Sequence, residues 1–324
     1  MRIPLELALP ENYGVADILA FHGRDSEQVS ERCAFVASEL KAQSSQTSQN
    51  SFEKAMLWGG YPACLGIQFR GHTAAVVLAV DISLEEDICA KKFELWQHEL
   101  QIIVQRMLGL NQDVAAFLQL FSAHPDIGAL ILRRANLRVP LSASPFEALC
   151  WAVTGQQISV SAAVSIRRRF IQLLGTVHSG GLCCHPSPPQ VAASEVALLR
   201  GIGLSKTKAQ TLILLAQAIE SGELALPANS DQPLNHASAD ALRAQLLSIR
   251  GIGPWTVNYV LLRGFAYLDG SLHGDVAVRR SLKILLGREE EISERQAQQW
   301  LTEFSPWRAL VAAHLWAMHS DAVY

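Results

Sequence analysis

The sequence shows no excess of basic charge. Its 324 residues include 27 lysines and arginines against 30 aspartates and glutamates, which gives a formal net charge of −3. A protein that holds nucleic acid over a broad surface is normally basic. Any contact with nucleic acid must therefore come from a local patch of positive charge or of backbone N–H groups.

Cysteine motifs and long apolar runs are also missing. The six cysteines are Cys33, Cys64, Cys89, Cys150, Cys183 and Cys184. They form no Cys-x-x-Cys pair and no four-cysteine ladder, so their spacing predicts free thiols rather than a zinc site or an iron–sulfur cluster. No apolar run has the length of a membrane span, and the first ten residues do not read as a signal peptide. We expect a soluble, cytoplasmic protein.

The most informative stretch covers residues 246–264. Apolar residues end one helix, Gly251-Ile252-Gly253 makes a tight turn, and Pro254 takes the first position of a second helix, where proline is tolerated. This pattern is a helix-hairpin-helix. Gly251 and Gly253 permit positive φ and a close backbone approach, so amide N–H groups can face an anion such as a DNA phosphate. Asp275 follows eleven residues after Gly264.

The same Arg-Gly-Ile-Gly turn occurs earlier, at residues 200–203, and is followed by Lys206 and Lys208. Either turn can present amides to a phosphate. Only the second turn has an aspartate at a suitable distance downstream. We therefore assign the catalytic hairpin to the second turn, and a structural or phosphate-binding role to the first.

The chain divides into two segments that differ in their secondary-structure signals. Up to residue 112 the pattern mixes strand and helix signals, whereas strand signals nearly vanish from Asp113 onward. We expect an α+β domain over residues 1–112 and an all-α domain over residues 113–324. Within the first domain we expect a strand at residues 5–9, a helix at 26–40, a polar loop at 41–51, a hairpin of 65–69 and 73–81, and a helix from 83 to 109.

Further motifs accompany the hairpin in order along the chain. They are Ser144-Pro145-Phe146-Glu147, Gly155-Gln156-Gln157-Ile158-Ser159-Val160, and Pro306-Trp307-Arg308 leading to His314-Leu315-Trp316. With the hairpin and Asp275, they make residues 145–318 resemble the helix-hairpin-helix DNA glycosylase superfamily, and within it the 3-methyladenine DNA glycosylase II branch. The resemblance implies a small antiparallel sheet with helices, followed by an all-α helix-hairpin-helix glycosylase domain.

The resemblance also implies a chemistry. Superfamily members that cut the DNA strand carry a lysine in the second hairpin helix, and Trp255 stands at that position here. This implies a monofunctional glycosylase, with Asp275 stabilising an oxocarbenium-like transition state or positioning water. Trp255, Tyr259 and Trp316 are implied as an aromatic pocket for a flipped alkylated purine of the 3-methyladenine or 7-methylguanine type.

The resemblance places DNA contacts on the two turns. Gly251 and Gly253 are expected to bind phosphate, together with Lys206 after the first turn. The wedge that fills the gap left by a flipped base is expected at Gln157, where an apolar residue would be usual, or at its neighbour Ile158.

Other expectations concern positive charge and cations. The run Arg167-Arg168-Arg169 is either a set of phosphate contacts or a solvated helix face. The backbone carbonyls of Ile249 and Ile252 are the expected ligands of a monovalent cation, by resemblance alone. No redox cofactor and no catalytic metal are expected.

Plainer interpretations stand beside these. An aspartate before a helix is an N-cap in most proteins, and the aromatic residues would usually be core. His314 is expected to be a hydrogen-bonded structural residue. We expect a monomer acting on double-stranded DNA with damaged bases, without a membrane partner. The alternatives are a non-catalytic helix-hairpin-helix DNA-binding protein, and a glycosylase for oxidised or deaminated bases.

Overall fold

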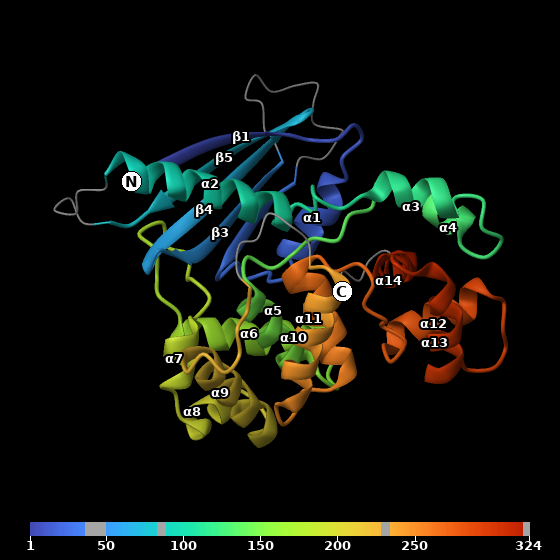
Figure 1. Ribbon diagram of the computed structural model, residues 1–324. Helices are drawn as coiled ribbons and strands as arrows, with labels where there is room; N and C mark the ends of the chain where they lie inside the picture. The colour runs from blue at the N-terminus through green and yellow to red at the C-terminus, as the bar shows by residue number, and fades with distance from the viewer. Residues whose placement is uncertain (36–49, 83–88, 228–233, 320–324) are drawn as a thin grey trace.

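The first part of the protein is built on a five-stranded antiparallel sheet of order β1-β5-β4-β3-β2. A computed structural model describes residues 1–35, 50–82, 89–227 and 234–319 (Figure 1). The strands are β1 (Arg2–Ala8), β2 (Glu31–Ala34), β3 (Ser51–Trp58), β4 (Tyr61–Arg70) and β5 (Thr73–Val80). β4 and β5 form the predicted hairpin, in which Arg70 pairs with Thr73 across a two-residue turn.

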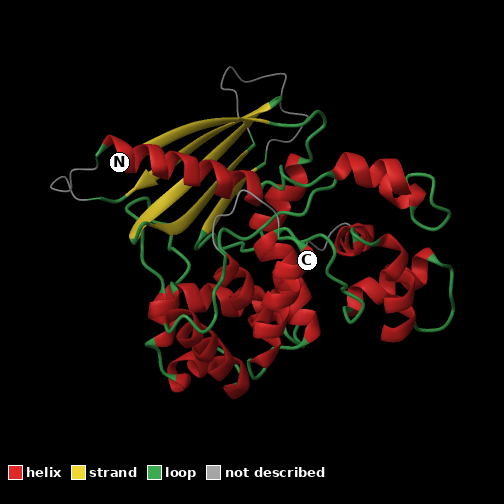
Figure 2. Cartoon of the chain, in the orientation of Figure 1, coloured by secondary structure: helices red, strands yellow, loops and turns green. Residues whose placement is uncertain are grey.

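One face of this sheet is covered by α2 (Ala90–Met107), and Figure 2 shows the helix lying across the strands. Leu65, Ile67 and Phe69 alternate along β4 and are buried, whereas Gln68 between them is exposed. This period of two is the signature of a strand with one face in a core. Trp96 and Leu100 of α2 complete that core from the helix side.

Two expectations for this part were wrong or incomplete. The helix predicted over residues 26–40 is wrong where the structure describes it, because residues 31–34 are β2, which pairs with β3. Pairing with a strand some twenty residues away outweighs a local helical pattern. β3 and α1 (Val15–His22) were not predicted. Residues 36–49 and 83–88 lie outside the described residues, so most of the loop predicted at 41–51 and the start of the helix predicted from 83 are untested.

From residue 114 onward the described elements are helices, as predicted. They are α3 (Val114–Phe121), α4 (Gly128–Arg133), α5 (Pro145–Gly155), α6 (Val160–Leu174), α7 (Pro188–Ala192), α8 (Val196–Gly201), α9 (Lys206–Glu220), α10 (His236–Ser248), α11 (Pro254–Phe265), α12 (Val276–Leu285), α13 (Glu294–Leu301) and α14 (Arg308–Trp316), with 3₁₀ turns at Thr302–Phe304 and Ala317–His319. α5 and α11 pack closely at the centre (Figure 1). Gly264 permits this approach, because a Cβ there would lie 3.2 Å from the Cα of Pro145.

The predicted fold class is confirmed: an α+β part with a small antiparallel sheet precedes an all-α part. Each part has its own hydrophobic core, one around β4 and α2 and the other around α5 and α11. The division of the chain between residues 112 and 113 stays a prediction. None of the described helices is both long and apolar enough to span a membrane.

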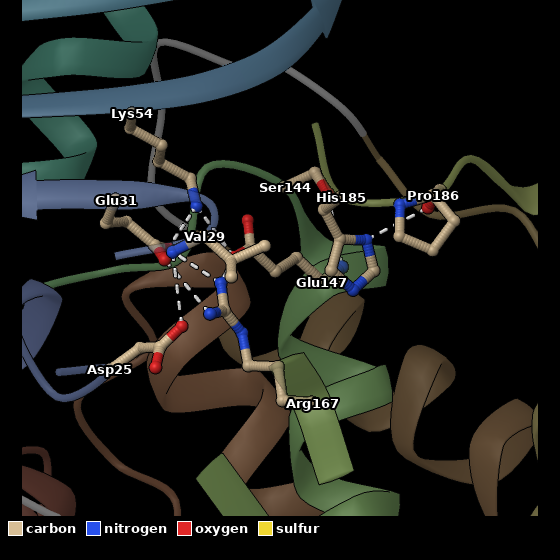
Figure 3. A network of polar contacts seen from close by, with 9 residues as sticks. All are labelled: Asp25, Val29, Glu31, Lys54, Ser144, Glu147, Arg167, His185 and Pro186. Atoms are coloured by element: carbon tan, nitrogen blue, oxygen red, sulfur yellow. Dashed lines mark hydrogen bonds and ion pairs between the residues drawn. The ribbon is translucent and has the colours of Figure 1, made fainter. Parts of the chain in front are cut away.

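A buried cluster of charges joins the two parts. Lys54 of β3 donates to Glu31 of β2 at 2.6 Å and to Glu147 of α5 at 2.8 Å. Arg167 of α6 donates to the same two carboxylates, at 2.7 and 2.8 Å, and Figure 3 shows both cations pointing between them. Two positive and two negative charges thus satisfy each other inside the protein.

This cluster corrects the interpretation of the arginine run. Arg167 is largely withdrawn from solvent and pairs with the buried Glu31 and Glu147, and Arg168 pairs with Asp25 and Glu27. Neither side chain is a solvated face or an available phosphate contact. Arg169 is exposed and stays a candidate for phosphate binding.

Candidate active site

The second Gly-Ile-Gly sequence forms the turn between α10 and α11, which we call the hairpin turn (residues 249–253). Gly251 has φ +94°, and a Cβ at this position would lie 2.2 Å from Oγ1 of Thr211 on α9. Only glycine fits that combination of conformation and space. Pro254 takes the first position of α11, as predicted. Gly253 is the N-cap of this helix with φ −109°, so it does not adopt the positive φ that the sequence pattern permits there. The N–H groups of the first turn of α11 are left without intrahelical acceptors.

Asp275 stands at the start of α12, close to two tryptophans. Its Oδ1 accepts from the Val278 N–H at 3.0 Å, which makes it the N-cap of α12. The indole Nε1 of Trp255 donates to Oδ2 at 2.8 Å, and that of Trp316 donates to Oδ1 at 3.2 Å. The N-cap interpretation and the catalytic one are therefore compatible, since the three donors fix the carboxylate in one orientation.

Three aromatic rings form a wall beside this carboxylate. The ring centroids of Trp255 and Tyr259 are 5.3 Å apart, and those of Tyr259 and Trp316 are 6.3 Å apart. The wall borders a cavity of about 520 Å³, into which Asp275 and Ile158 also face. That volume lies within the range of about 300 to 1,000 Å³ that is typical of small-molecule sites.

Among the cavity-lining residues that sequence reasoning missed, Trp151 and Arg280 have the largest side chains. Trp151 lies within the apolar α5, where nothing in the sequence separates a cavity wall from ordinary core. Arg280 is exposed on α12, one turn beyond Asp275. The i, i+5 spacing from Asp275 offers a weak signal only once the aspartate has been assigned.

Two further arginines that were not predicted, Arg263, which is buried, and Arg24, which is half-buried, pack on the aromatic residues. The guanidinium of Arg24 lies 4.2 Å from the ring centroid of Trp151 and 4.2 Å from that of Phe21. Arg263 lies 4.5 Å from the Phe21 ring centroid and 5.6 Å from that of Trp316, and donates to the Pro140 carbonyl. Burial lowers the pKa of Arg263 to about 10. Because Phe21 belongs to α1 and Arg24 follows it, these contacts connect the first part of the chain to the cavity wall.

The expected wedge residues lie in the loop between α5 and α6, which we call the wedge loop (residues 155–159). Gln157 is exposed and has φ +56°, a conformation that costs free energy for any residue with a Cβ. Ile158 is 37% exposed and lines the cavity. The loop thus presents one polar and one apolar side chain beside the cavity, and which of them acts as a wedge stays a prediction.

The other residues predicted to contact DNA or a cation are Lys206, Ile249 and Ile252. Lys206 is exposed at the first position of α9, three residues after the first Gly-Ile-Gly turn, and it does not line the cavity. The Ile249 carbonyl accepts the Ile252 N–H at 3.1 Å, and the cation site at these residues stays a prediction. Among the described residues, no group of three or more His, Cys, Asp or Glu side chains is arranged to hold a metal ion.

His314 corrects a further expectation. Its two ring nitrogens are buried without a hydrogen-bond partner among the described residues, and the ring stacks on Phe117 with centroids 5.5 Å apart. Burial lowers the pKa of His314 to about 3, so the ring is held neutral as part of an apolar core.

Comparison with known proteins agrees with this geometry. Residues 150–306 match the family described as "HhH-GPD superfamily base excision DNA repair protein". The chain is 28% identical over 232 residues to DNA-3-methyladenine glycosylase of Bacillus subtilis, covering 70% of this chain and 75% of that protein. It is 30% identical over 194 residues to DNA-3-methyladenine glycosylase 2 of Escherichia coli, covering 59% of this chain and 63% of that protein.

A solved structure extends the likeness of fold to nearly the whole chain. The 3-methyladenine DNA-glycosylase from Archaeoglobus fulgidus superposes with a TM-score of 0.75 over 98% of both chains, at 19% identity. The helix-hairpin-helix, the wedge loop and Asp275 lie within the matched segment. Residues 150–306 are thus similar to the helix-hairpin-helix superfamily of base excision DNA repair proteins.

Proposed function

We propose that this protein is a monofunctional DNA glycosylase that works as a monomer and removes alkylated purines, of the 3-methyladenine and 7-methylguanine type, from duplex DNA. One observation carries the proposal: the Asp275 carboxylate is fixed by two indole N–H groups at the edge of an aromatic cavity. The names of the Bacillus subtilis and Escherichia coli relatives support the same substrate class.

The aromatic wall suits a cationic base. Flipping a base out of the duplex costs a few kcal/mol of free energy in lost stacking and pairing, and this cost is lower for a damaged base. Stacking on Trp255, Tyr259 or Trp316 offsets that cost, and cation–π attraction adds roughly 0.5 to 2 kcal/mol for a positively charged ring. Such a wall recognises charge and planarity rather than one pattern of hydrogen bonds, which predicts a broad range of alkylated substrates.

Asp275 suits the bond cleavage. Breaking the N-glycosidic bond develops positive charge on the sugar, and a fixed carboxylate stabilises that charge or positions the attacking water. An alkylated purine is already cationic, so it leaves without a strong general acid. One carboxylate at the cavity edge is therefore sufficient for this mechanism.

The cavity lining supports hydrolysis without strand cutting. In the described part of the chain no lysine lines the cavity, and Trp255 occupies the position of the Schiff-base lysine in related lyases. Gly251 and Gly253 of the hairpin turn would hold a phosphate next to the flipped nucleotide, with Lys206 adding a more distant contact.

The test is base release from duplexes that carry alkylated, deaminated or oxidised bases, measured under single-turnover conditions. Alkylated purines should be released most rapidly, and Asp275→Asn should lower the rate by at least about 100-fold while DNA binding persists. Normal base release by Asp275→Asn would remove the catalytic role of Asp275. A covalent protein–DNA adduct after borohydride treatment would overturn the monofunctional assignment.

A further inference from the structure

The first Gly-Ile-Gly turn is followed by two lysines whose side chains lie differently. Lys206 is exposed, whereas Lys208, two residues further along α9, is turned towards α5. Its Nζ donates to the carbonyls of Thr154 at 2.9 Å and Gln156 at 2.6 Å. Burial lowers the pKa of Lys208. These carbonyls lie at the C-terminal end of α5, where the helix leaves acceptors unpaired and its dipole attracts a cation.

Gln156 continues the connection to the hairpin turn. Its Nε2 donates to the Gly251 carbonyl at 3.0 Å and to Oγ1 of Thr256 on α11 at 2.9 Å. Oγ1 of Thr211, one turn beyond Lys208 on α9, donates to the Arg250 carbonyl at 3.0 Å. We call the side chains of Gln156, Lys208 and Thr211 the brace. The brace joins the wedge loop, the hairpin turn and α9 by five hydrogen bonds.

We propose that Lys208 and Gln156 are positioning residues for base flipping. They hold the wedge loop at a fixed distance from the hairpin turn. The loop that fills the gap in the base stack and the turn that holds the DNA backbone therefore form one rigid unit. The inference rests on the proposed glycosylase function. It divides that function into two stages, base flipping and bond cleavage. Flipping from a duplex requires the brace, whereas cleavage of a base that is already unstacked requires only Asp275 and the cavity.

The conformation of Gln157 gives the physical reason. A residue with a Cβ stays at φ +56° only where its surroundings enforce that conformation. Lys208 holds the carbonyls of Thr154 and Gln156, the second of which belongs to the peptide unit that leads directly into Gln157. Without these contacts the loop samples other conformations, and ordering it on DNA costs backbone entropy.

A simpler role for Lys208 would be to cap α5. A cap affects the stability of the fold and therefore all substrates alike, whereas the brace affects only substrates that must be flipped. The contacts of Gln156 support the second role, because this side chain does not cap α5 and instead reaches the hairpin turn.

The experiment compares full-length Lys208→Met, Lys208→Arg and Gln156→Leu with the unaltered protein. Single-turnover release of 7-methylguanine is measured from a matched duplex and from a single strand of the same sequence. Flipping is followed by the fluorescence of 2-aminopurine placed next to the lesion in the duplex. Lys91→Met, the same chemical change on the exposed part of α2, is the matched control, and thermal unfolding confirms that each variant is folded at the assay temperature.

For Lys208→Met and Gln156→Leu we expect the duplex rate and the flipping signal to fall by roughly 10-fold or more, with less than about a twofold change on the single strand. Lys208→Arg should recover most of the duplex rate, since its guanidinium can still donate to two carbonyls. Equal losses of rate on the duplex and on the single strand would overturn the proposed role of the brace. An unchanged flipping signal in Lys208→Met and Gln156→Leu would overturn it as well. An unaltered protein that releases no alkylated base would instead overturn the proposed function.

Discussion

Replacing Lys54 by methionine isolates the energetic role of the buried charge cluster. The Lys54 side chain is 1% exposed, and those of its partners Glu31 and Glu147 are 4% and 7% exposed. With Arg167, the cluster holds two positive and two negative charges, so the variant leaves one buried negative charge unpaired. Breaking such a cluster from one side typically costs about 3 to 5 kcal/mol in the free energy of unfolding.

Two companion variants make the interpretation specific. In Lys54→Met/Glu147→Gln the cluster is neutral again, and we expect the free energy of unfolding to recover by about 2 kcal/mol relative to Lys54→Met. Arg32→Met breaks an ion pair with Glu53 of similar length, 2.7 Å, whose side chains are 49% and 43% exposed. That exposed pair should contribute less than about 1 kcal/mol.

The same cluster predicts a pH dependence. Burial alone would raise the pKa of Glu31, but Arg167 and Lys54 outweigh it and lower this pKa to about 2. A carboxyl with a depressed folded-state pKa stabilises the protein above its unfolded-state pKa, and this contribution is lost as the pH falls from about 5 towards 2.

Urea unfolding followed by tryptophan fluorescence, at pH 7.5 and at pH 4, measures all of these quantities. The cost of Lys54→Met should be larger at pH 7.5, because a proton can neutralise the excess buried carboxylate at low pH. A cost no greater than that of Arg32→Met, or a double variant no more stable than Lys54→Met, would refute the reasoning about buried charge.

Three other predictions concern the site and the core. Gly251→Ala should destabilise the protein by at least about 1 kcal/mol in urea unfolding, because its Cβ would meet Thr211; an unchanged stability would contradict the geometry of the hairpin turn. Burial lowers the pKa of His22 to about 3 and that of His185 to about 4. As the pH falls, these histidines are protonated in the unfolded chain before they are in the folded protein, so the free energy of unfolding should decrease from about pH 7 to pH 4. A free energy of unfolding that stays constant between about pH 7 and pH 5 would contradict this prediction. Asp275→Asn should keep its melting temperature within a few degrees, because an asparagine can still accept the Val278 N–H, and a large loss in thermal unfolding would show that the carboxylate is mainly structural.

The elements predicted correctly are those whose signals are local. α11 begins at Pro254, where proline and the preceding glycine indicate a helix start, and the β4–β5 hairpin follows from two β-favouring runs around Gly71. β2 was missed because its conformation depends on pairing with β3, and nothing within residues 31–34 indicates that partner. Secondary structure fixed by a distant strand is inaccessible to a pattern read within a short window.

The candidate site was predictable only in part, for a similar reason. The motifs and the family resemblance gave Asp275, Trp255, Tyr259 and Trp316, and the structure brings these four side chains to one cavity. The interpretation of Arg167 failed because its partners, Glu31 and Glu147, lie 136 and 20 residues away in the sequence. A run of arginines carries no signal of the carboxylates that the fold will place opposite it.

The two Arg-Gly-Ile-Gly turns show how identical sequences acquire different roles. At Gly201, the counterpart of Gly251 in the first turn, a Cβ would meet no heavy atom of the described residues within 4 Å beyond its own helix. At Gly251 the nearest atom is Oγ1 of Thr211 at 2.2 Å, and Thr211 belongs to α9, the helix that follows the first turn. The first hairpin therefore packs against the second and supports it, and Lys208 on the same helix supports the wedge loop. The repeated motif is thus a pair in which one copy positions the other, a relation that depends on which side chains lie behind each glycine.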